Sequence, residues 1–116
     1  MLLGKDYINS KGSFTLTSGF LSDDPIKCGV NYSMVNGAIE GFVYGASIEL
    51  QKGIRINAVS PGLVVEQVNF SIDAPTVGQL PVPVNKVVQA YYKSAFGCLT
   101  GQVFRVWESS TQWVRK

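Results

Sequence analysis

Three places in the chain combine hydroxyl, amide and backbone groups at spacings that suit ligand binding or catalysis. Tyr32 and Asn36 are four residues apart, so in a helix they share one face. Ser18 ends a polar-apolar alternation, and the triplet Ser60-Pro61-Gly62 follows a second apolar segment. No histidine occurs among the 116 residues, which excludes histidine-based triads, histidine general bases and the usual zinc sites.

The same residues also have simple structural interpretations. A serine at the end of a strand, such as Ser18, can satisfy a local backbone group. Tyr32 could be a buried or interfacial tyrosine whose hydroxyl is hydrogen-bonded. The triplet Ser60-Pro61-Gly62 could be an ordinary tight turn after a strand. Residue types and spacing leave both interpretations open at each place.

Alternation and turn residues predict the elements that would position these groups. Ser13–Ser18 alternates polar and apolar residues and ends at Gly19, which is typical of a strand. The longest helix is predicted over Tyr32–Gln51, with Asn31 as its N-cap and Gly53 after its end. The other predicted elements are a strand over Ile54–Val59, a helix over Pro83–Ala95 and a strand over Gln102–Trp107.

This order of elements indicates an α/β fold in a single domain, residues 1–116. Strands separated by helices pair in parallel through right-handed crossovers. The carboxyl ends of parallel strands meet at one edge of the sheet, where ligands bind. We therefore expect residues 17–19 and 60–62 to lie close together at that edge. The irregular segment Leu63–Val82 is predicted to be a lid or binding segment over it.

The predicted long helix is unusual in having apolar residues on almost every side. Gly37, Gly41 and Gly45 repeat every four residues and form a ridge with almost no side chain, which permits close approach of another backbone. We expect one side of this helix to pack on the sheet and another on a second copy of the chain, giving a homo-oligomer through Tyr32–Gln51. The alternative is a helix that is fully buried within one chain.

Composition excludes several classes of protein. Hydrophobic residues make up 46% and charged residues 16%, as in a globular chain with a substantial core. The net charge of +2 is scattered, so neither nucleic acid nor a membrane surface is expected as a partner. No apolar run reaches the roughly 18 residues of a membrane span. Cys28 and Cys98 fit neither a disulfide framework nor a metal site and favour a cytoplasmic protein.

Together these segments resemble the short-chain dehydrogenase/reductase family over about residues 1 to 107. Residues 12–19 resemble the strand that carries the family's catalytic serine, and residues 32–42 resemble its catalytic helix. Residues 53–62 resemble the next strand and its nicotinamide-side turn, with Arg-Ile-Asn-Ala-Val-Ser-Pro-Gly as the most specific part. Residues 99–103 resemble the approach to the last core strand. The implied fold is the C-terminal half of a Rossmann-like, doubly wound parallel sheet.

The resemblance implies an oxidoreductase that transfers hydride between NAD or NADP and a small carbonyl or alcohol substrate. In this family's pattern Tyr32 would transfer the proton and Ser18 would hold the substrate oxygen. Asn36 would position the nicotinamide ribose, and the triplet Ser60-Pro61-Gly62 would contact the cofactor.

Two departures from the family's pattern concern the catalytic residues. Asn36 stands where the family has a lysine, whose charge lowers the pKa of the tyrosine. A neutral amide has no such effect, so Tyr32 is expected to be a weaker general acid or base. The serine position of the family could also fall on Gly19 instead of Ser18.

A third departure is the absence of the family's glycine-rich turn after an N-terminal strand, which binds pyrophosphate. We therefore interpret the chain as a partial domain without the N-terminal cofactor-binding half. The alternative function is a non-catalytic binding or oligomerisation module derived from this family.

Overall fold

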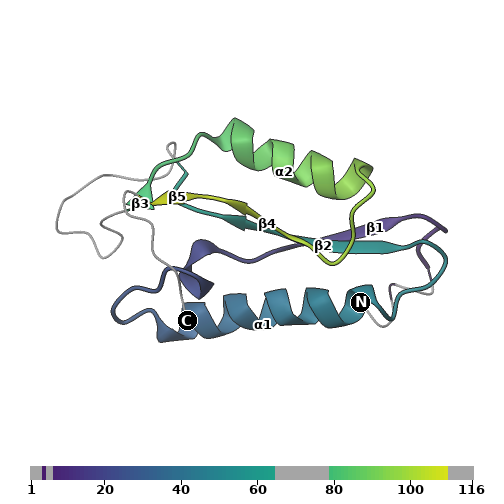
Figure 1. The fold of residues 1–116 in the computed structure, drawn as a ribbon, viewed down its shortest axis with the longest axis horizontal. Coiled ribbons are helices and arrows are strands. Elements are labelled where there is room, and N and C mark those ends of the chain that lie inside the picture. The colour runs from purple at the N-terminus through teal and green to yellow at the C-terminus, as the bar shows by residue number, and fades with distance from the viewer. Residues whose placement is uncertain (1–3, 5–6, 65–78, 110–116) are drawn as a thin grey trace.

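A computed structural model describes residue 4, residues 7–64 and residues 79–109. Its centre is a parallel sheet of three strands in the order β1 (Ser13–Thr17), β2 (Arg55–Pro61) and β4 (Val103–Val106). Helix α1 (Val30–Ser47) covers one face and helix α2 (Val84–Phe96) the other, which gives three layers (Figure 1). The predicted α/β class, with parallel strands alternating with helices, is confirmed.

Three short elements complete the fold. The single-turn 3-10 helix η2 (Phe20–Ser22) follows β1 and packs on α1. Strand β3 (Gln79–Leu80) pairs antiparallel with β5 (Glu108–Ser109). Of the segment Leu63–Val82, residues 63–64 and 79–82 are described, and Val64 forms a parallel bridge with Val82. The predicted lid otherwise lies outside the described residues.

The register of the sheet brings the two predicted turns to one edge. Thr17 pairs with Val59, and the Ser18 N–H donates to the Val59 carbonyl at 2.9 Å. On the other side of β2, Pro61 pairs with Val106 and the Gly62 N–H donates to its carbonyl at 3.0 Å. The expected proximity of residues 17–19 and 60–62 is therefore confirmed.

Strand β2 continues through Ser60 and Pro61, so the predicted end of this strand at Val59 is wrong. The N–H groups of Ala58 and Gly62 donate toward β4. By alternation the N–H of residue 61 would face β1, which has already ended at Thr17. A proline at this position therefore removes no hydrogen bond from the sheet.

Both faces of β2 are buried, and its buried residues include the polar Asn57 and Ser60. On the α1 side Ile56 and Ala58 pack with Val43 and Ala46. On the α2 side Val59 packs with the second core cluster, which comprises Val82, Val87 and Ala90.

Helix α1 begins and ends earlier than predicted. Its N-cap is Gly29, which makes no side-chain capping bond, so Asn31 lies in the first turn and its predicted capping role is wrong. The helix ends at Ser47 instead of Gln51. The turn into β2 then uses positive φ angles at Lys52 (64°) and Gly53 (70°), and Gly53 stops the segment as expected.

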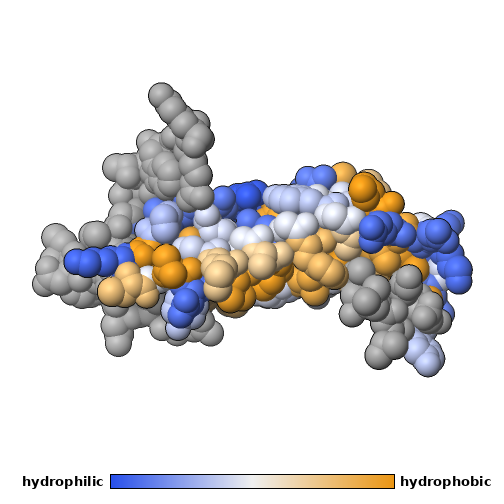
Figure 2. Space-filling view, turned by 90° about the horizontal axis from the view of Figure 1, so that it is seen from below, coloured by the Kyte–Doolittle hydropathy of each residue, from blue (hydrophilic) through white to orange (hydrophobic). Residues whose placement is uncertain are grey.

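The outward face of α1 is apolar and uncovered by the described residues, and Figure 2 shows it as a hydrophobic band along the molecule. The exposed large apolar side chains of this face, including the C-cap residue, are Val30, Met34, Val35, Phe42 and Ile48. Apart from the nearby backbone of α1 itself, no described atom lies within 4 Å of the positions that Cβ atoms would take at Gly37, Gly41 and Gly45. One side of α1 packs on the sheet as predicted, and full burial of the helix is wrong for the described chain.

Neither helix in the described part of the chain is both long and apolar enough to cross a membrane. Across the same residues, no group of three or more histidine, cysteine, aspartate or glutamate side chains is arranged to hold a metal ion.

Candidate functional site

The carboxyl edge of the sheet and the N-terminal half of α1 form the candidate site. Asn36 lies beside Gly19, and its Nδ2 is 3.0 Å from the position that a Cβ of residue 19 would occupy. Tyr32 lies one turn nearer the start of α1, and its side chain is 65% exposed. Within the described residues, neither the Asn36 amide nor the Tyr32 hydroxyl has a hydrogen-bond partner. Both side chains therefore have hydrogen-bonding capacity available for a ligand.

The hydroxyl of Ser18 has a protein partner. Ser18 Oγ donates to Glu40 Oε2 at 2.9 Å, and Ser22 Oγ donates to the same oxygen at 2.8 Å. Glu40 is a residue of α1 and is only 6% exposed, because its side chain faces the loop that follows β1. The structure thus brings Ser18 to the predicted edge and directs its proton into the protein.

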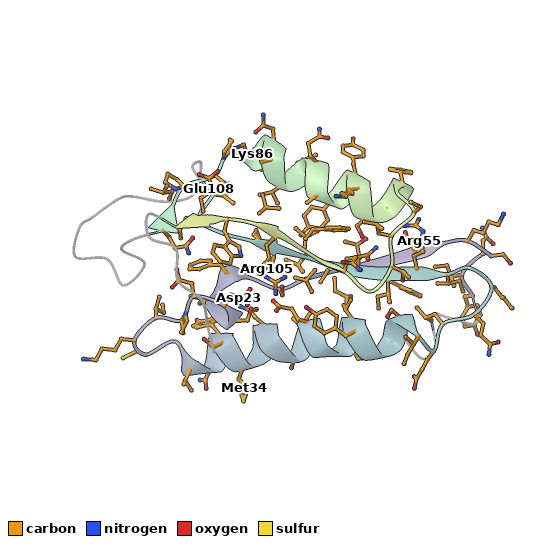
Figure 3. All side chains as sticks on the ribbon, in the orientation of Figure 1. Asp23, Met34, Arg55, Lys86, Arg105 and Glu108 are labelled. Atoms are coloured by element: carbon orange, nitrogen blue, oxygen red, sulfur yellow. The ribbon has the colours of Figure 1, made fainter. Side chains whose placement is uncertain are left out.

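Arg105 links the same carboxylate to β4. Its Nη2 lies 3.7 Å from Glu40 Oε1, and its Nε donates to Asp23 Oδ2 at 2.6 Å. Figure 3 shows Arg105 and Asp23 facing each other between the sheet and α1. The hydrogen bond to Asp23 raises the pKa of Arg105 above its ordinary value, against partial burial, and a hydrogen bond to Tyr44 adds to the effect. Arg105 is therefore a permanent cation beside the buried carboxylate.

Sequence reasoning missed this group of Ser18, Ser22, Asp23, Glu40 and Arg105, which we call the Glu40 network. One signal was present, because Glu40 is an acid in a helix that is otherwise almost entirely apolar. Buried carboxylates require charged or hydrogen-bonding partners. The partners come from a loop and a strand 22 and 65 residues away in sequence, so their identity depends on the fold.

Near the end of β2, three buried side-chain atoms have no hydrogen-bond partner among the described residues. These atoms are Ser60 Oγ, Gln79 Oε1 and Trp107 Nε1. Gly62 packs tightly here, since a Cβ at this position would lie 2.4 Å from Trp107 Cβ and 3.5 Å from Gln79 Oε1. The other end of the Gln79 amide is fixed, because its Nε2 donates to Asp24 Oδ2 at 2.5 Å. One amide acceptor, one hydroxyl donor and one indole donor therefore lie near the end of β2.

Known proteins of similar sequence and structure include dehydrogenases and an oxidoreductase. The protein lin1944 from Listeria innocua is 47% identical, with a TM-score of 0.84, and the match covers 90% of this chain and 52% of that one. A small-chain dehydrogenase solved in complex with NADPH is 28% identical, with a TM-score of 0.68 over 89% of this chain and 52% of its own. No family model matches the chain.

An uncharacterized oxidoreductase of Bacillus subtilis (strain 168), YmfI, is 42% identical over 57 residues, which are 48% of this chain and 24% of that protein. The chain thus spans about half the length of the similar solved structures, and its 57 aligned residues cover about a quarter of YmfI. Its sheet, crossover helices and sequence similarities match those of short-chain dehydrogenases and reductases. The resemblance of the sequence to this family is confirmed.

We expect Arg105→Met to destabilise the protein by about 2–3 kcal/mol, since it leaves Glu40 buried without its cation. The value is at the low end for buried ion pairs because the Arg105 side chain is 41% exposed. Urea unfolding followed by circular dichroism measures the change. Lys86→Met is the matched control, since the Lys86–Glu108 pair is exposed on both sides and should contribute under about 1 kcal/mol. Equal losses for the two variants would contradict a stabilising role of the Glu40 network.

Proposed function

We propose that the chain forms the substrate and nicotinamide side of an NAD- or NADP-dependent oxidoreductase that interconverts small carbonyl compounds and alcohols. The observation that carries this proposal is the pairing of Thr17 with Val59, which sets the turn at residues 60–62 beside the loop at Gly19. Asn36 lies against that loop, on the helix face that also carries Tyr32. The similarity of the chain to known dehydrogenases and oxidoreductases favours this function over the alternative of a non-catalytic binding module.

In this proposal Tyr32 transfers the proton between the substrate oxygen and solvent. Its exposed hydroxyl has no protein partner in the described chain, so it is available to a ligand. Asn36 supplies neutral hydrogen-bonding groups and no positive charge. We therefore expect proton transfer to be slower than in a site with a cation beside the phenol.

The residues around the turn after β2 fit the amide end of a nicotinamide. A carboxamide accepts hydrogen bonds through its oxygen and donates through its nitrogen. Trp107 Nε1 and Ser60 Oγ can donate to such an oxygen, and Gln79 Oε1 can accept from such a nitrogen. Each of these buried atoms costs about 1–3 kcal/mol when unpaired, so a ligand that pairs them is favoured. The bound nicotinamide would supply or accept the hydride.

We expect the natural polypeptide that contains this sequence to bind NADPH or NADH and to reduce members of a panel of soluble ketones and aldehydes. Tyr32→Phe should lower kcat by about 10²-fold and leave nucleotide affinity unchanged, because only the proton donor is removed. Cofactor binding is followed by tryptophan fluorescence and turnover by absorbance at the nicotinamide band.

Tyr92→Phe is the matched control for this variant, since Tyr92 is an exposed tyrosine on α2, where it stacks on Phe96. The function would be refuted if the natural polypeptide bound neither nucleotide. A Tyr32→Phe enzyme as active as Tyr92→Phe would instead remove Tyr32 from the reaction.

We also propose that the outward face of α1 joins two copies of the protein. This face exposes large apolar side chains along its length, and surfaces of this kind mark sites of association. The open ridge of Gly37, Gly41 and Gly45 would let a second helix approach at short range. Three interior glycines cost about 3 kcal/mol of helix propensity relative to alanine, which close packing can offset.

Gly41→Leu should weaken such an oligomer at least tenfold, because the added side chain keeps the facing helix away. The same change should not destabilise the monomer, since leucine favours the helix over glycine by several tenths of a kcal/mol or more. Light scattering over a dilution series measures the association. Gln89→Leu, at an exposed position of α2, controls for an added surface leucine. A natural polypeptide that is monomeric at all concentrations would contradict this interface.

A further inference from the structure

We propose that Asn36, and not Ser18, presents the hydrogen-bond donor that holds the substrate's carbonyl oxygen. This inference rests on the proposed oxidoreductase function and assigns a substrate-binding role within that site. It follows from the different surroundings of the two side chains.

Ser18 has no proton left to donate to a ligand. A serine hydroxyl carries a single proton, and that of Ser18 is donated to Glu40 Oε2 at 2.9 Å. The acceptor is a buried carboxylate, and hydrogen bonds to charged groups are stronger than those to neutral groups. Turning the hydroxyl toward a neutral carbonyl would exchange a charge-assisted bond for a weaker one and leave Glu40 short of a donor.

Asn36 has the complementary properties. Its side-chain amide carries two N–H donors and one acceptor, none of them paired within the described chain. Nδ2 is the amide atom nearest to residue 19, at 3.0 Å from the position of the missing Cβ. Because residue 19 is glycine, no side chain stands between this nitrogen and the edge of the sheet. A Cβ at position 19 would require the Asn36 amide to shift by a few tenths of an ångström.

The position of Asn36 also suits cooperation with Tyr32. Residues four apart on a helix have Cβ atoms about 5–6 Å from each other, so the phenol and the amide can reach the same oxygen. Asn36 would polarise the carbonyl with one N–H while Tyr32 delivers the proton. The second N–H and the amide oxygen would stay available for the ribose contact that the family resemblance implies.

The test compares four variants of the natural polypeptide at saturating NADPH, with the ketone from the panel that is reduced fastest. Asn36→Ala and Asn36→Asp should each lower kcat/KM for the ketone by about 10²-fold, the usual effect of losing one donor to a reacting oxygen. Ser18→Ala and Ser22→Ala form the matched pair, because both serines donate to the same oxygen of Glu40 at nearly equal distances. If Ser18 serves only Glu40, the two serine variants should agree within about threefold.

A second readout does not depend on turnover. In the ¹⁵N-labelled protein with NADP⁺ bound, the side-chain NH₂ signal that is lost in Asn36→Asp should shift on addition of the alcohol product. The nucleotide affinity of the Asn36 variants, measured by fluorescence, separates a role at the ribose from one at the substrate.

Each result bears on the proposal. A Ser18→Ala enzyme at least tenfold worse than Ser22→Ala, with Asn36 variants near the parent value, would overturn it and leave the oxidoreductase function intact. Asn36 variants that weaken only nucleotide binding would overturn it as well. No reduction of any panel member by the parent protein would remove both the function and this inference.

Discussion

The carboxylate of Glu40 is the buried charge around which the candidate site is arranged. Taking a carboxylate out of water costs several kcal/mol unless a cation and hydrogen-bond donors replace the water. Here the donors are Ser18 and Ser22 from the loop after β1, and the cation is Arg105 from β4. These partners hold the loop, the helix and a strand in one relative position. Gly19, inside that loop, is thereby placed against Asn36.

Tyr32 and Asn36, the two polar groups on the first turns of α1, have different surroundings from the Glu40 network. Glu40 and the side chains that bind it face inward and determine the shape of the site. Tyr32 and Asn36 have no protein partners in the described chain and are available to a ligand. A helix that carries one buried acid and two unpaired polar groups near its start can thus be both a structural support and a reactive surface.

The apolar outward face of α1 follows from a different physical constraint. A helix whose large side chains surround it on nearly every side is stable in water only when a second surface covers what the sheet leaves exposed. The glycine ridge on that face makes a close partner possible. The chain spans about half the length of similar solved structures, and within the described residues this face has no covering surface.

Much of the fold could be predicted from the sequence, because its signals are local. The polar-apolar alternation before Gly19, the strand ending at Ser60-Pro61-Gly62 and the helix between them are encoded by neighbouring residues. Their parallel pairing follows from the chirality of crossover connections. Boundaries were less accurate: the N-cap of α1 is Gly29 instead of Asn31, because glycine is also accepted at this position without a side-chain bond. Strand β2 extends through a proline because its neighbour β1 has already ended.

The site shows where local information ends. The sequence by itself determined which residues could do chemistry, namely Ser18, Tyr32, Asn36 and the triplet Ser60-Pro61-Gly62, and the class of fold that brings them to one edge. Only the tertiary structure decided which of them has a protein partner, because a hydrogen-bond donor is committed by the acceptor that the fold places beside it. Glu40 lies 22 residues from Ser18 and 65 from Arg105, and no local pattern reveals that their side chains meet.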